Sequence, residues 1–188
     1  MKKNIFAIIG SASKDSSNRK LVERLAELSQ ADFRITIFDR LSDLPHFDPL
    51  LSINQPPLEV ISFRSEIQQA DGIIICTPEY IFSIPSRLKN AIEWCVSTTV
   101  FSQKPVGLIT ASAQGIKCHA ELKLIMKTVE ARFNDQTSLL IQGIKGKMVG
   151  KMNSFDLKTE ESLVRFLDSF RDLLRDGGRY NESRTGSI

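Results

Sequence analysis

The sequence predicts an α/β fold, in which a five-stranded parallel sheet in the order 2-1-3-4-5 carries helices on both faces. Two observations indicate it. Five short apolar runs alternate with segments of helical period, which is typical of strand–helix–strand units. The central run, residues 73–76, has apolar and mostly β-branched side chains throughout, as a strand buried on both faces does. Right-handed crossovers then place the switch point of the sheet between strands one and three.

Each predicted strand ends where the residue pattern stops favouring a strand. Residues 4–9 end at Gly10, and the central run ends at Thr77-Pro78, since proline has no N–H to extend a ladder. The five predicted strands are residues 4–9, 33–38, 73–76, 106–110 and 137–142.

Apolar residues at helical spacing predict a helix after each strand. These helices cover about residues 18–30, 58–69, 85–95, 118–133 and 159–175. Residues 39–57 hold several prolines and no steady period, so we expect an irregular connection that includes one helical turn. The polar, glycine-rich residues 177–188 are predicted to be a disordered tail, which leaves 1–176 as a single domain.

Composition limits the classes of function. With 188 residues, 41% apolar and 25% charged, the chain has the balance of a soluble domain, and no apolar run approaches the roughly 20 residues of a membrane helix. A net charge of +3 indicates no nucleic-acid partner and is compatible with an anionic small ligand. Three widely spaced cysteines predict reduced thiols in a cytoplasmic protein and no metal site.

The loop after the first predicted strand has the composition of an anion site. Residues 10–18 read GSASKDSSN, which puts hydroxyls, an amide and a lysine directly before a helix. Helix N-terminal N–H groups and the helix dipole favour phosphate there. The plainer interpretation is a polar loop whose Ser16 or Ser17 caps the helix. The sequence has neither a GxGxxG nor a GxxxxGK[ST] motif, which excludes dinucleotide-fingerprint and P-loop proteins.

Two loops together resemble the NADPH-dependent FMN reductase family. That family carries GSxRxxSxN after strand one and TPEYNxSxPGxLKNAIDW after strand three, where this chain has GSASKDSSN at 10–18 and TPEYIFSIPSRLKNAIEW at 77–94. The resemblance implies a flavodoxin-like three-layer sandwich, FMN as cofactor and NADPH or NADH as cosubstrate. The site residues that it implies are Ser11, Ser13, Ser16, Ser17 and Asn18 for the phosphate, Pro78, Glu79, Tyr80, Ile81 and Phe82 for the ring, and Ser112, Gln114 and Gly115 for the far side of the ring.

The chain departs from the family pattern at three places. Ser13 stands where the family has arginine, so a bidentate phosphate partner is missing. Ile81 and Phe82 replace an asparagine and a small residue. Phe82 must therefore stack on the ring, turn to a partner subunit or fill the pocket. Ser86 replaces a glycine.

The resemblance implies an FMN-dependent NAD(P)H oxidoreductase that reduces a quinone, free flavin or similar acceptor, with the flavin rather than a protein side chain carrying the chemistry. The alternative is a catalytically weak flavin- or nucleotide-binding regulatory protein of the same fold. We also expect a homodimer or homotetramer, with Ile81, Phe82 and Ile84 at its interface, and no nucleic-acid or membrane partner. His119 is predicted to be a surface or capping residue, and Lys145, Lys147 and Lys151 to form a solvated loop.

Overall fold

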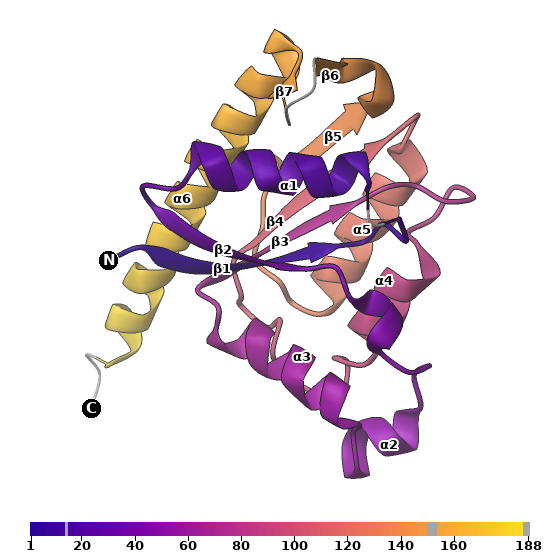
Figure 1. Ribbon diagram of the computed structural model, residues 1–188. Helices are drawn as coiled ribbons and strands as arrows, with labels where there is room; N and C mark the ends of the chain where they lie inside the picture. The colour runs from indigo at the N-terminus through magenta and orange to yellow at the C-terminus, as the bar shows by residue number, and fades with distance from the viewer. Residues whose placement is uncertain (14, 150–153, 186–188) are drawn as a thin grey trace.

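A five-stranded parallel sheet forms the middle layer of the molecule (Figure 1). The structure is a computed structural model that describes residues 1–13, 15–149 and 154–185. Its strand order, β2-β1-β3-β4-β5, confirms the predicted one. The strands are β1 Lys3–Ile9, β2 Phe33–Phe38, β3 Gly72–Thr77, β4 Val106–Ser112 and β5 Ser138–Gln142.

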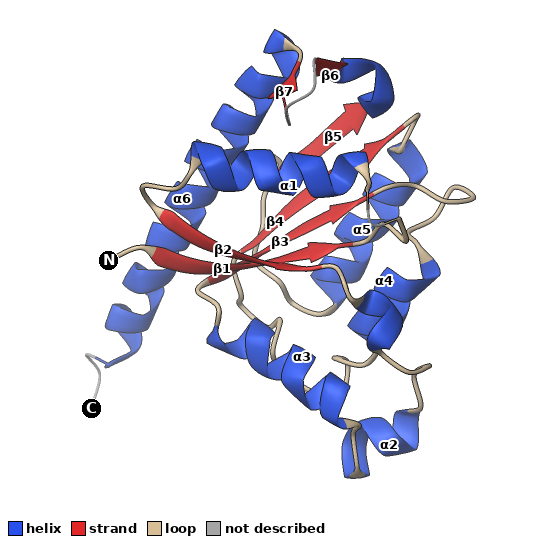
Figure 2. Ribbon diagram, viewed as in Figure 1, coloured by secondary structure: helices blue, strands red, loops and turns tan. Residues whose placement is uncertain are grey.

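Helices cover both faces of this sheet (Figure 2). The apolar sides of α1 Ser17–Leu28 and α6 Leu157–Thr185 pack with one face. The other face packs against α3 Leu58–Gln69, α4 Ser86–Glu93 and α5 Ile116–Thr128. The central strand β3 is buried along its whole length, because it has a neighbour on each side and a helix layer on each face. The predicted three-layer sandwich is therefore confirmed.

The connection after β2 is more ordered than predicted. It contains a 3₁₀ turn, Leu41–Asp43, and a short helix, α2 Pro49–Asn54. The guanidinium of Arg64 on α3 donates to the Ser52 and Trp94 carbonyl oxygens and ties α2 to the end of α4. Such a contact between distant segments has no local sequence signature.

Two helix ends differ from the prediction. Helix α5 ends at Thr128 rather than near residue 133, since Glu130 adopts a positive φ of 58°, and the chain there turns back towards β5. Helix α6 continues to Thr185 instead of ending near Arg175. Residues 186–188 lie outside the described part, and the disorder expected of the tail stays a prediction, as does the domain boundary at 176.

The segment after β5, predicted to be irregular, contains regular structure. A 3₁₀ turn, Ile144–Lys147, leads into the antiparallel pair β6 Met148–Val149 and β7 Ser154–Phe155.

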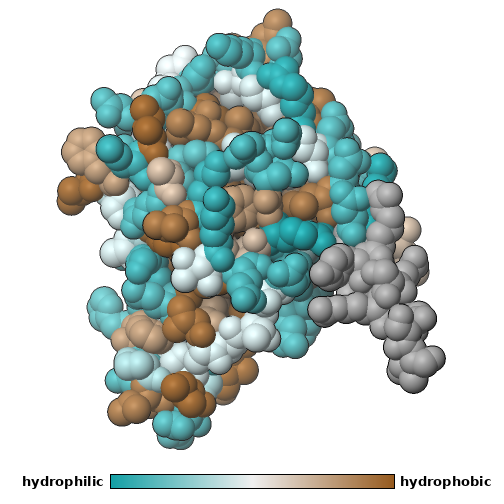
Figure 3. All heavy atoms as spheres, turned by 180° about the vertical axis from the view of Figure 1, so that it is seen from behind, coloured by the Kyte–Doolittle hydropathy of each residue, from teal (hydrophilic) through white to brown (hydrophobic). Residues whose placement is uncertain are grey.

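Apolar side chains lie in separate patches among hydrophilic ones on the face that Figure 3 presents. Among the described residues no helix has the length and apolar character needed to cross a bilayer.

Candidate functional site

A cavity of about 570 Å³ opens at the carboxyl edge of the sheet, where the loops after β1, β3, β4 and β5 meet. Ligands of open α/β sheets bind at this edge. Nine of the predicted site residues line the cavity: Ser11, Ser13, Ser16, Ser17, Asn18, Pro78, Glu79, Tyr80 and Ser112. The predicted residues Ile81, Phe82, Gln114 and Gly115 are not among those that line it.

The serine loop packs tightly against the end of β3. Gly10 donates its N–H to the Cys76 carbonyl oxygen at 2.8 Å, and a Cβ built on Gly10 would lie 2.3 Å from the Thr77 hydroxyl oxygen. Only glycine allows this approach. The loop ends at Ser16, the N-cap of α1, whose hydroxyl accepts the Arg19 N–H at 3.2 Å. Because that bond uses a lone pair, the Ser16 hydroxyl hydrogen remains to donate.

Asn18 ties the start of α1 to the carboxyl ends of β3 and β4. Its side-chain amide donates to the Ala111 carbonyl oxygen at 3.2 Å, and its Oδ1 accepts the Cys76 thiol at 3.3 Å. The residue is only 4% exposed. Asn18 lies at the site as predicted, but these bonds give it a positioning role for the ends of β3 and β4. Burial raises the pKa of the Cys76 thiol, so it stays a neutral donor.

Glu79 links the loop after β3 to the start of α5. Its Oε1 accepts the Gly115 N–H at 3.1 Å and its Oε2 accepts the Cys118 N–H at 2.9 Å. The carboxylate thus satisfies two of the N–H groups that a helix start leaves without partners. Gly115 is the N-cap of α5, with φ 81°. The role of Gly115 is therefore to position the start of α5.

The chain reverses direction over Tyr80–Ser83 in a two-residue turn. Tyr80 and Ser83 exchange backbone hydrogen bonds of 3.0 and 3.1 Å, and the central residues Ile81 and Phe82 have positive φ of 51° and 59°. This is the φ pattern of a type I′ turn, for which asparagine and glycine are the favoured residues. Each bulky residue there costs about 1–3 kcal/mol.

The turn holds its two apolar side chains in solvent. Ile81 is 96% and Phe82 68% exposed, so Phe82 does not fill the cavity. On the α5 side, the Glu121 carboxylate accepts the Ser83 hydroxyl at 2.7 Å and the Ile84 N–H at 2.9 Å. Ile84 itself is buried in the core, which corrects its predicted place at an interface.

The segment after β5 forms a wall of the cavity that the sequence interpretation missed. Gly143, Ile144, Lys145 and Gly146 all line it, and Lys145 is exposed, as expected of a solvated loop residue. Lys147 pairs instead with Asp156 at 3.5 Å, and Lys151 lies outside the described residues. The predicted topology did indicate this wall, because the carboxyl ends of all strands in a parallel sheet lie at the same edge, and the loop after β5 is therefore at that edge too.

His119 is half-buried and bridges two strands, rather than lying on the surface as predicted. Its Nδ1 is 3.0 Å from the Thr110 hydroxyl on β4, and its Nε2 is 3.2 Å from the Ser138 hydroxyl on β5. Burial is the main cause that lowers the pKa of His119, and the Lys123 ammonium adds to it. The neutral imidazole is thus part of the support behind the site.

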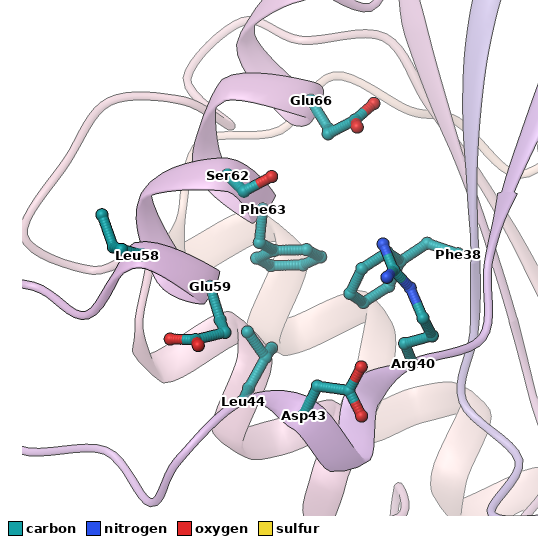
Figure 4. A pocket seen from close by; sticks show the side chains of 9 residues that line it. All are labelled: Phe38, Arg40, Asp43, Leu44, Leu58, Glu59, Ser62, Phe63 and Glu66. Atoms are coloured by element: carbon teal, nitrogen blue, oxygen red, sulfur yellow. The ribbon is translucent and has the colours of Figure 1, made fainter.

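A second, smaller cavity of about 260 Å³ lies between the end of β2 and α3. The Phe38 and Phe63 rings lie in it with their centroids 5.0 Å apart, and the Arg40 guanidinium lies over the Phe38 ring (Figure 4). None of its lining residues belongs to the serine loop or to the loops after β3 and β4. It is therefore separate from the candidate site.

The strand order 2-1-3-4-5, with a serine-lined cavity at the carboxyl edge, is that of the flavodoxin-like class of α/β proteins. The sequence profile of NADPH-dependent FMN reductases matches residues 3–143, and the chain belongs to this family. It is an oxidoreductase with FMN as cofactor and a nicotinamide cosubstrate. The alternative of a catalytically silent regulatory relative is not favoured.

Characterised relatives cover nearly the whole chain. The NADH:(hydroxy)cinnamate reductase subunit CrdA of Vibrio ruber is 34% identical, over 91% of this chain and 85% of its own. A quinone reductase of Escherichia coli K12 is 29% identical, over 93% of this chain and 96% of its own. Among solved structures, the flavoenzyme FerB, an NAD(P)H:(acceptor) oxidoreductase from Paracoccus denitrificans, superposes with a TM-score of 0.82 at 28% identity, over 93% and 98% of the two chains.

We predict that Glu79→Ala lowers the free energy of unfolding by about 1–2 kcal/mol, because two helix-start N–H groups lose their acceptor. Urea denaturation followed by circular dichroism measures the change. The matched control is Glu161→Ala, since within the described part of the chain Glu161 makes only an exposed ion pair of 3.7 Å, worth about 0–1 kcal/mol. Equal losses in both variants would contradict the role given to Glu79.

The pKa of His119 predicts a loss of stability in acid. The pKa is lower in the folded chain than in the unfolded one, so the unfolded state binds more protons as the pH falls below about 6.5. The contribution of His119 to the free energy of unfolding should therefore be fully present above that pH. It should be lost as the pH falls through the lower pKa that His119 has in the folded chain. The unfolding free energy of wild type minus that of His119→Gln, measured from about pH 7.5 to 5, should decrease. A constant difference would refute this.

Proposed function

We propose that this protein binds FMN in the cavity at the carboxyl edge, with the phosphate at the serine loop and the ring beside Pro78, Glu79 and Tyr80, and that it uses NADPH or NADH to reduce a quinone or similar acceptor. The observation that carries the proposal is the convergence of the serine loop, the start of α1 and the Pro78–Tyr80 corner on one cavity.

The residues present fit such a group. A volume of about 570 Å³ lies within the roughly 300–1,000 Å³ of small-molecule sites. Ser16 keeps a hydroxyl hydrogen beside the N-terminus of α1, as an anion requires. The Pro78–Tyr80 corner lines the same cavity, and its exposed Tyr80 ring offers the aromatic surface that a flavin ring requires.

FMN, when bound, supplies the hydride chemistry, and the chain supplies position and exclusion of water. Glu79 fixes the Pro78–Tyr80 corner relative to α5 through its two backbone partners. Asn18 keeps the serine loop against β3 and β4. With its pKa raised by burial to about 12, the Cys118 thiol next to this corner stays protonated. None of these side chains transfers a proton in our proposal.

The names of the relatives support a quinone as the acceptor class, because the curated relatives include quinone reductases from several bacteria. The purified protein should bind FMN and oxidise NADPH or NADH when a benzoquinone is added. FMN fluorescence titration and absorbance at the nicotinamide band measure the two properties. Absence of FMN binding at micromolar concentration would reject the cofactor site, whereas binding without turnover would reject the reductase activity.

Ser16 offers a specific test of the phosphate position. Ser16→Ala should weaken FMN binding by about 1–2 kcal/mol, because one hydroxyl donor beside the phosphate is lost. The comparison variant is Ser42→Ala, which removes an exposed hydroxyl whose partner is the neighbouring Asp43 carboxylate, away from the cavity. FMN affinity that is unchanged in Ser16→Ala would rule out the role of this hydroxyl.

We further propose that two copies associate through the Tyr80–Ser83 turn, in a cytoplasmic homodimer or in a homotetramer built from it. Two exposed apolar side chains held in an unfavourable backbone conformation are a cost that burial against a second copy would offset. Ile116, at the start of α5, is also exposed. The family resemblance supports an oligomer as well.

Replacing the two central residues of the turn should stabilise the single chain and weaken the association of two copies. The double variant Ile81→Asn, Phe82→Gly suits the observed turn and should raise the unfolding free energy of the single chain by about 1–3 kcal/mol. It should also shift sedimentation towards the monomer, because the apolar contact is lost. A variant that stays as associated as the wild type would refute this interface, and Val164→Asn on α6, also an exposed apolar position, is the control.

A further inference from the structure

The 3₁₀ turn after β5 brings a lysine to the wall of the cavity that also contains the serine loop. Lys145 lines the cavity with Ser11, Ser13, Ser16 and Ser17. The turn is also tied to the start of α1, since the Ser17 hydroxyl donates to the Met148 sulfur at 3.5 Å. The lysine therefore belongs to a segment that is in direct contact with the predicted phosphate loop.

Local contacts fix the direction of this turn. Gly143 adopts a positive φ of 65° and donates its N–H to the Ala113 carbonyl oxygen at 3.1 Å. Ile144 is buried in the core beneath the sheet edge, and the Gly146 N–H closes the turn on the Gly143 carbonyl oxygen at 3.0 Å. With Ile144 anchored inward, the next residue stands on the outer side, where it lines the cavity.

The charges around the cavity leave Lys145 available for an anion. The charged residues in its described lining are Asp15, Glu79 and Lys145. Asp15 pairs with Lys20 at 3.0 Å, and Glu79 accepts two backbone N–H groups. Within the described ranges, no ion pair joins Lys145 to a carboxylate, whereas Lys147 in the same turn pairs with Asp156.

We propose that Lys145 supplies the positive charge that binds the FMN phosphate, and so makes the site select FMN over riboflavin. The inference rests on the proposed function. Serine hydroxyls and the α1 start provide neutral donors, position 13 offers a hydroxyl rather than a cation, and Lys14 of the same loop lies outside the described residues. An ammonium on a flexible stem binds phosphate as a point charge, and Lys145 stands exposed at the wall of the cavity.

The test compares FMN with riboflavin, which lacks only the phosphate. Both are titrated by fluorescence quenching against wild type, Lys145→Met, Lys145→Arg and the matched control Lys147→Met. Lys145→Met should weaken FMN binding about 10- to 100-fold and change riboflavin binding less than about twofold. Lys145→Arg should stay within about threefold of wild type for FMN, as should Lys147→Met, since both keep the charge at position 145.

Several results would overturn the inference. These are unchanged FMN affinity in Lys145→Met, an equal loss for riboflavin, an equal loss in Lys147→Met, or a Lys145→Arg variant as weak as Lys145→Met. The double variant Ser13→Arg, Lys145→Met supplies a cation from the exposed serine loop, and recovered preference for FMN supports the charge as the cause. If wild type binds neither flavin, the proposed function fails together with the inference. If wild type binds FMN and Lys145→Met binds it with the same affinity, only the inference fails.

Discussion

The geometry of the site depends on one carboxylate that joins two neighbouring strand ends. Glu79 follows β3 and holds the first N–H groups of α5, the helix that follows β4. Since β3 and β4 are adjacent and parallel, this contact converts two separate loops into one rigid corner. The serine loop is held to the same corner from the other side, through the Gly10 N–H and the Asn18 amide.

The sequence predicts the sheet and most of the cavity well, for a physical reason. Strands buried on both faces must be apolar throughout, so the limits of β3 are visible in the residues to within one residue at each end. The edge strand β2 and the helix α3 have the predicted bounds, and the other strands differ by a few residues. The order of strands then determines which loops share an edge. Hence Ser11, Ser16 and Tyr80 could be placed together from the motifs that carry them.

What the sequence could not predict are the contacts that depend on side-chain direction. Asn18 lines the cavity, and nothing in its motif indicates that its amide also bonds the Ala111 carbonyl oxygen and the Cys76 thiol. His119 was expected at the surface, although it lies between two strand hydroxyls. Such bonds join residues far apart in the chain, and neither partner has a local pattern that indicates the other.

The two unusual features of the site have a common consequence for its selectivity. The Ile81–Phe82 turn directs bulk away from the cavity, so neither side chain lines it. The serine loop has Ser13 where the family pattern has arginine, and Lys145 on the loop after β5 lines the same cavity. A parallel sheet makes this exchange possible, because the carboxyl ends of β1 and β5 face the same space although two other strands lie between them. A cation on the loop after β5 can therefore serve an anion bound after β1 without any change in the fold.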